Sequence, residues 1–132
     1  MHKSQWMELL LVGTGGFVGS VLRYTVSGLV HRLLGAAFPY GTVSVNVIGC
    51  LAIGMLGGLA ESRQVIGPEL RLFLFLGLLG GFTTFSSFGY ELFQMARDGE
   101  QAKVLASIGL HLAAGLSAVW LGYTLTSIRW ST

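Results

Sequence analysis

The sequence contains little charge. Only 11% of its 132 residues are charged, 52% are hydrophobic and the mean hydropathy is +0.68. A soluble domain carries roughly 25% charged residues, so this composition excludes an ordinary soluble monomer. The eight basic residues are spread along the chain and leave a net charge of only +2. The sequence therefore also lacks the basic cluster of a nucleic-acid-binding protein.

Cysteine is almost absent. The single residue, Cys50, excludes an intramolecular disulfide and a multi-cysteine metal site. The three histidines are dispersed, and the sequence has neither a phosphate-binding loop nor a Ser/His/Asp constellation, so we expect no transition-metal centre and no enzyme. Glycine is abundant, with 20 residues, and suits closely packed membrane helices. These features predict a small integral membrane protein.

Four intervals between the charged residues are long enough to cross about 30 Å of hydrocarbon as helices. They cover residues 9–34, 40–60, 70–95 and 104–128. The first is the least regular, because Arg23, His31 and Arg32 interrupt it. We expect one all-α, four-helix membrane domain over residues 1–132. A cleaved signal peptide is the alternative for the first interval.

Positive charge is nearly balanced across the membrane. One side would hold the termini and the second connection, and the other side the first and third connections. The basic residues of the first side are Lys3, Arg63, Arg71 and Arg129. Those of the second side are Arg32, Arg97 and Lys103, with Arg23 near it. The difference in positive charge between the two sides is too small to fix one orientation, and four helices are too few to enclose an aqueous path. Both points favour an inverted pair of chains over a single fixed orientation. The GxxxG pairs Gly15–Gly19, Gly54–Gly58 and Gly77–Gly81 would give such pairing a surface.

Polar residues inside the spans are the candidates for function, because they are costly in a bilayer. Asn46 is the only asparagine and lies in the middle of the second span, where its amide serves either an ion path or an interhelical hydrogen bond. The third span contains GGFTTFSSFG, residues 80–89. Its paired glycines and four hydroxyls predict a break whose free carbonyls can coordinate a cation such as Na⁺. A kink satisfied by neighbouring hydroxyls is the alternative.

Three phenylalanines of the third span, Phe82, Phe85 and Phe88, recur at every third residue. The electropositive ring edges can face a small anion. Lipid contact or packing is the commoner role of such rings. Arg23 is a candidate for concentrating anions at a pore mouth. Alternatively Arg23, like Glu91, lies at a span end with its charge in water.

The segments GSVLRY (19–24), GTVSVNVIG (41–49) and GGFTTFSSFGYE (80–91) resemble, in this order, motifs of the Fluc/CrcB family of bacterial fluoride channels. The resemblance extends over nearly the whole chain. It implies a passive, highly selective channel in the bacterial inner membrane that exports fluoride and lowers its toxicity. It also implies an antiparallel, dual-topology homodimer with two pores, embedded in lipid.

The same resemblance implies roles for individual residues. Main-chain carbonyls of Gly80 and Thr83 would hold a structural Na⁺ ion on the dimer axis. The pore residues would be Asn46, Phe85 and Phe88. Arg23 would lie in the vestibule, and the further polar positions along the path would be Thr42, Thr84, Ser87 and Ser107. The fourth helix departs from the family, which often has a Tyr and a Ser where this chain has Ser107 and the titratable His111.

Two other functions fit four spans. A small multidrug-type dual-topology exchanger requires a mid-membrane carboxylate in its first helix, but Glu8 lies at the start of the first span and no acid follows inside it. A non-transporting assembly subunit would use Asn46 for packing alone. It predicts no ion flux and near-normal folding after Phe85→Ile, whereas a channel would lose conduction.

Overall fold

The computed structural model describes residues 2–62 and 65–127, and helices joined by short connections make up this part of the chain. Arg63 and Arg129 of the charge comparison, and the last residue of the fourth expected span, lie outside the described residues. The elements are α1 (Lys3–Leu34), α2 (Tyr40–Ser62), α3 (Pro68–Arg71), η1 (Leu72–Leu79), α4 (Gly80–Phe82), α5 (Phe85–Arg97), α6 (Gln101–Gly109), η2 (Leu110–Ala114) and α7 (Gly115–Ser127).

Within residues 2–62 and 65–127, four helices are long and apolar enough to cross a membrane. They are Lys3–Leu34, Tyr40–Ser62, Pro68–Arg97 and Gln101–Ser127. The last two are built from the shorter elements, and the third is interrupted between α4 and α5. Proline stands at the first position of α3, where its missing N–H costs nothing, and directly before α2. The expectation of an all-helical, multi-pass membrane protein is therefore confirmed.

The first helix begins at Lys3, earlier than the expected start near Leu9. Its first turn is closed by a side chain, since the backbone N–H of His2 donates to Oε1 of Gln5 at 2.8 Å. This is one half of a capping box, in which the third helical residue reaches back to the cap. The polar first turns extend the helix beyond the apolar interval.

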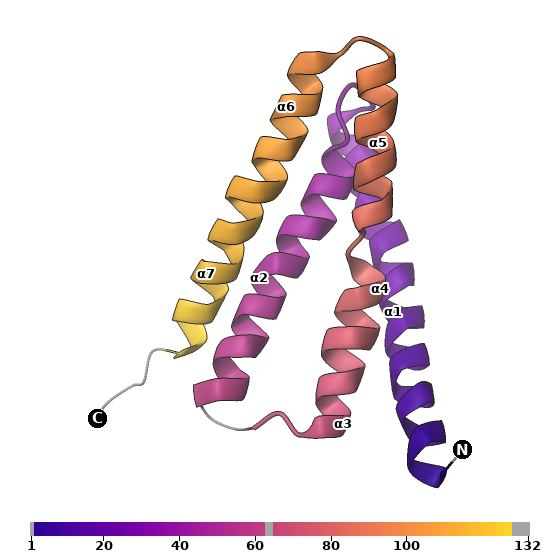
Figure 1. Cartoon of the computed structure of the whole chain (residues 1–132), viewed down its shortest axis with the longest axis vertical. Coiled ribbons are helices and arrows are strands. Elements are labelled where there is room, and N and C mark those ends of the chain that lie inside the picture. Colours follow the sequence, from indigo (N-terminus) through magenta and orange to yellow (C-terminus); the bar gives the residue numbers. More distant parts are fainter. Residues whose placement is uncertain (1, 63–64, 128–132) are drawn as a thin grey trace.

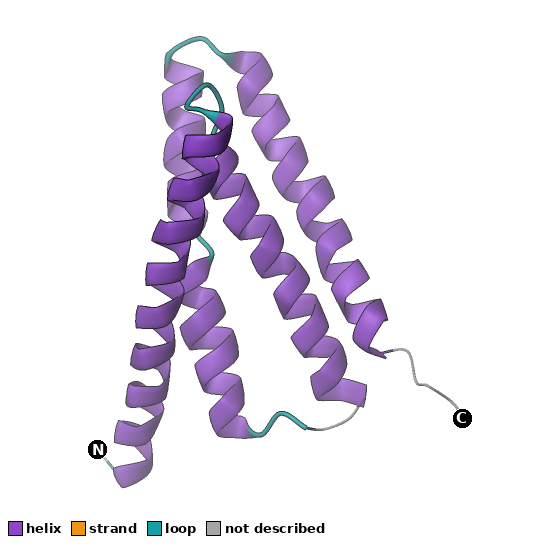
Figure 2. Cartoon of the chain, turned by 180° about the vertical axis from the view of Figure 1, so that it is seen from behind, coloured by secondary structure: helices purple, strands orange, loops and turns teal. Residues whose placement is uncertain are grey.

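The helices form two packed pairs. α2 packs mainly against α7, and α1 packs mainly against η1 and α4. The start of α1, the end of α2, the start of α3 and the end of α7 lie at one end of the molecule, and the α5–α6 and α1–α2 connections lie at the other (Figures 1 and 2). An even number of crossings therefore returns the chain to its starting side.

The GxxxG glycines pack inside the chain, where five of them are buried and Gly81 is half-buried. A Cβ added at Gly15 would meet the backbone of Phe73 and Gly77 at 2.6 and 3.0 Å, and one added at Gly58 would meet the carbonyl of Tyr123 at 2.7 Å. The glycines thus allow α1 to approach η1 and α2 to approach α7. The expectation that they form the surface for a second subunit is wrong, because this spacing marks a close approach without saying which helix approaches.

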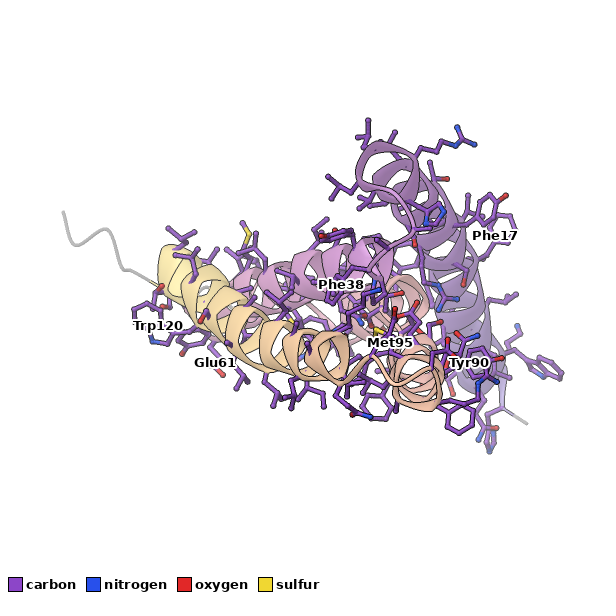
Figure 3. The ribbon with its side chains drawn as sticks, turned by 90° about the horizontal axis from the view of Figure 1, so that it is seen from above. Phe17, Phe38, Glu61, Tyr90, Met95 and Trp120 are labelled. Carbon is purple, nitrogen blue, oxygen red and sulfur yellow. The ribbon has the colours of Figure 1, made fainter. Side chains whose placement is uncertain are left out.

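Large apolar side chains cover the outside. Phe17 and Trp120 project away from the ribbons, whereas Met95 lies among them (Figure 3). Phe17 is 72% exposed and Trp120 is 69% exposed. A soluble monomer rarely carries so much exposed apolar surface, so these side chains are placed for contact with lipid.

Candidate functional site

The third span is interrupted at the two threonines that follow α4. Thr83 has φ −89° and ψ 161°, and Thr84 has φ −151° and ψ 122°, so both are extended. The hydroxyl of Thr83 donates to the carbonyl of Leu79 at 2.8 Å and closes the helix before the break. The hydroxyl of Thr84 accepts the N–H of Ser87 at 3.1 Å and caps α5. The threonines therefore end one helix and start the next.

Two carbonyl groups at the break are left free. Within the described residues, no hydrogen bond outside the regular helices reaches the carbonyl oxygen of Gly80 or of Thr83. The N–H of Thr84, which would bond Gly80 in a continuous helix, is taken by the side chain of Asn46. The break thus presents two uncommitted backbone oxygens at the depth of the membrane.

Asn46 pairs with both backbone groups of Thr84. Its Oδ1 accepts the Thr84 N–H at 2.8 Å, and its Nδ2 donates to the Thr84 carbonyl at 2.9 Å. Because a backbone N–H only donates and a carbonyl only accepts, this pairing fixes the orientation of the amide. The interhelical hydrogen bond is therefore present, and it is made to a helix break rather than to an intact helix.

His111 lies on the other side of the same amide. Nε2 of the ring is 3.0 Å from Nδ2 of Asn46, and Nδ1 is 2.9 Å from the carbonyl oxygen of Ser107. The ring also stacks on Phe88, with centroids 4.0 Å apart and planes inclined by 39°. η2, a π-helical segment, brings His111 to this position. Such wide turns are frequent at functional sites.

A groove of about 430 Å³ runs past the break. Its wall includes Asn46, Thr83, Phe85, Phe88 and His111, with Gly80 beside them. The rings of Phe85 and Phe88 are tilted by 60° with centroids 5.7 Å apart, as expected for neighbours on one helical face. Phe85 is 83% exposed, so a single chain leaves this wall open.

A second recess, of about 440 Å³, lies beyond Thr84. Its lining brings together Arg23, Thr42, Thr84 and Ser87, four of the residues singled out by sequence. Arg23 forms no ion pair with another described residue. The recess thus combines hydroxyls with an uncompensated cation, and Thr84 belongs to both hollows.

Glu91 contributes to the interior rather than to the water. Its Oε1 accepts the hydroxyl of Thr42 at 2.6 Å. Its Oε2 is buried and has no hydrogen-bond partner among the described residues. Sequence reasoning placed Glu91 at a span end, and only the register of α2 against α5 identifies Thr42 as its partner.

Ser107 is fully buried, and its hydroxyl has no hydrogen-bond partner among the described residues. It lines neither of the two hollows. Its contribution to the site is its carbonyl, which accepts from His111. The structure therefore brings seven of the eight predicted path residues to the two hollows and leaves the Ser107 side chain apart.

These features define a class: a multi-pass helical membrane protein whose third helix is broken by an extended segment that an asparagine holds in place. The sequence matches the family described as "CrcB-like protein, Camphor Resistance (CrcB)" over residues 10–123. The chain belongs to this family, which confirms the resemblance drawn from its motifs.

Proteins with known names are similar over most of their length. A fluoride-specific ion channel FluC from Methylobacillus flagellatus is 47% identical over 122 residues, 92% of this chain and 95% of its own. A FluC from Nitrosococcus oceani is 43% identical over 93% of this chain and 98% of its own. A FluC from Chlorobium phaeobacteroides is 50% identical over 73% of this chain and 74% of its own. Because these relatives are ion channels, the expectation that the chain is not an enzyme is confirmed.

Proposed function

We propose that the chain is a passive fluoride channel of the bacterial inner membrane that exports fluoride and lowers its toxicity. The observation that carries the proposal is the groove in which the broken third helix, Asn46, Phe85 and Phe88 come together. The names of the similar proteins support the choice of ion. The small multidrug-type exchanger receives no support from these relatives.

The chemistry of the hollows suits a small anion that holds its water tightly. A selective path must replace that water with donors yet release the ion. Here the donors are the amide of Asn46, the hydroxyls of Thr42, Thr84 and Ser87, and the electropositive ring edges of the two phenylalanines. Arg23, as a cation in the neighbouring recess, attracts anions toward the path.

Export needs no chemical energy source. Hydrogen fluoride crosses a membrane as the neutral acid and dissociates in the less acidic cytoplasm. A pore that passes only the anion then lets the negative-inside potential expel it, with about 2.3 kcal/mol per charge for each 100 mV.

We propose further that two chains form an antiparallel, dual-topology homodimer with two pores. The open wall at Phe85 supports this, because an ion path bordered by lipid would lack its polar lining. A second copy provides the missing wall. The near balance of positive charge allows insertion in both orientations.

A structural Na⁺ ion fits the same arrangement. The uncommitted carbonyls of Gly80 and Thr83 are hard oxygen donors of the kind that unwound membrane helices offer to Na⁺. Gly80 is exposed on the open side of the groove, where a second copy would add the same two oxygens. Bound Na⁺ would stabilise the dimer, and its replacement by a large organic cation should dissociate it.

Phe85→Ile tests the channel directly. Purified protein is reconstituted in liposomes loaded with fluoride or chloride, and efflux is started with valinomycin and followed with ion-selective electrodes. We expect rapid fluoride release without chloride release from the native chain and none from Phe85→Ile. The matched control is Phe17→Ile, which changes the same residue type on the lipid side and should conduct normally. Fluoride release that persists in Phe85→Ile would remove this ring from the path.

A further inference from the structure

Both N–H groups of the Asn46 amide have partners in the structure, so the amide serves an anion only where one partner gives way. One N–H is given to the Thr84 carbonyl and the other points at Nε2 of His111. The bond to Thr84 holds the helix break in place. The N–H that faces His111 is therefore the one that becomes available to an ion in the groove when His111 no longer accepts it.

The tautomer of His111 follows from its neighbours. The carbonyl of Ser107 only accepts, so Nδ1, at 2.9 Å, carries the proton. In the neutral ring Nε2 is then an acceptor and takes the N–H of Asn46 at 3.0 Å. When Nε2 is protonated, it no longer accepts, and two N–H groups face each other at this distance. The ring then has to move aside, and both N–H groups are left to an anion in the groove.

We propose that His111 is a positioning residue for the Asn46 amide. The neutral ring withholds one amide N–H from fluoride, and the protonated ring releases it and adds a second donor beside it. This inference rests on the proposed fluoride channel and assigns proton control to the same site. The ligand of the paired donors is a small anion, fluoride in the proposed function.

The surroundings of the ring can accommodate its charge. From α5, the face of Phe88 lies against the ring, where an aromatic face attracts an imidazolium. The carboxyl group of Glu91, also on α5, is engaged by the hydroxyl of Thr42 on α2. From α2, the titratable group that shares the groove is the thiol of Cys50. Within the described residues, α6 and α7 bring no charged side chain into the groove.

Current through planar bilayers tests the inference, because neutral hydrogen fluoride carries no current. The native chain is compared at about pH 7.5 and about pH 5.5 on both sides, which spans the range in which imidazole changes its charge. We expect fluoride current to rise about tenfold on acidification, the lower end of the gain in association rate that a charged cleft gives an ion of opposite sign.

His111→Gln separates positioning from packing. The side-chain oxygen of the glutamine can accept the N–H of Asn46, and the glutamine does not titrate in this pH range. The variant should show a ratio of about one between its currents at the two pH values, whatever the size of the current at neutral pH. His2→Gln, which removes an exposed histidine at the start of α1, should retain the native ratio. If His111→Gln does not assemble, His111→Ser takes its place.

A native current that does not change with pH, or the same pH response in the His111 variants, would overturn the assignment while leaving the channel in place. No native fluoride current at either pH would instead contradict the proposed function.

Discussion

Asn46→Asp is the substitution whose effect follows most directly from the geometry. The aspartate keeps the oxygen that accepts the Thr84 N–H. Its second oxygen replaces Nδ2 and faces two acceptors, the Thr84 carbonyl at 2.9 Å and Nε2 of His111 at 3.0 Å. Two hydrogen bonds are lost, and both former partners face an oxygen.

The size of the effect can be bracketed. Side-chain hydrogen bonds in membrane proteins average about 0.6 kcal/mol, so two lost bonds set a lower bound of about 1 kcal/mol. Two buried acceptors left unsatisfied at about 1–3 kcal/mol each set an upper bound of about 6 kcal/mol. A protonated carboxyl can donate to only one of the two partners, so protonation recovers about half of the loss.

Thermal unfolding in detergent, followed by the circular dichroism of the helices, measures the stability of the variant. Fluoride efflux from liposomes measures its conduction. We expect a lower unfolding temperature and no efflux. Asn46→Leu distinguishes hydrogen bonding from charge, since it removes the same donors without adding a carboxylate, and it should be destabilised to a similar degree. Native stability in both variants would refute the role given to Asn46 at the break.

Two further predictions concern packing. Gly49→Ala places a Cβ against the side chain of Thr83, and the hydrogen bond from the Thr83 hydroxyl to Leu79 holds that side chain in place. We therefore expect a loss of about 1–3 kcal/mol in stability and reduced efflux. Gly57→Ala on the same helix meets nothing within 4 Å and should gain up to about 1 kcal/mol, and equal unfolding temperatures for the two variants would contradict this packing. Ser107→Ala removes a buried hydroxyl without a described partner, so its unfolding temperature should equal or exceed the native value, and a marked fall would reveal a missed partner.

The break itself could be predicted from sequence because its cause is local. Adjacent glycines weaken a helix, and threonine hydroxyls compete for its backbone groups. Residues 80–89 therefore predict an interruption without reference to the rest of the chain. The spacing of Phe85 and Phe88 is equally local and gives two rings on one face. Local chemistry thus accounts for the elements of the site.

The partners across helices could not be predicted in the same way. Asn46 is 38 positions from Thr84 and 65 from His111, and their meeting depends on the rotation and register of three helices. His111 lies in the π-helical segment η2, whose wider turns change the direction in which the side chain points. The sequence does not predict this segment. Glu91 was misplaced for the same reason, since its partner Thr42 lies on another helix.

The geometry of the break explains how two residues can serve two proposed ions. Carbonyls of consecutive extended residues point in opposite directions. Asn46 holds the Thr84 carbonyl toward α2, so the alternation turns the Thr83 carbonyl away from α2. The pairing that orders the anion groove therefore also orients an oxygen for the cation.

This arrangement couples the two proposed sites through one amide. Asn46→Asp should weaken both fluoride efflux and the dependence of the dimer on Na⁺, because both rely on the orientation of the Thr83–Thr84 segment. Phe85→Ile should abolish efflux and leave that dependence unchanged, since its ring contributes no oxygen. Size-exclusion chromatography in Na⁺ and in a large organic cation separates the cases. A Na⁺ response in Asn46→Asp that equals the native one would show that the break keeps its shape without the asparagine.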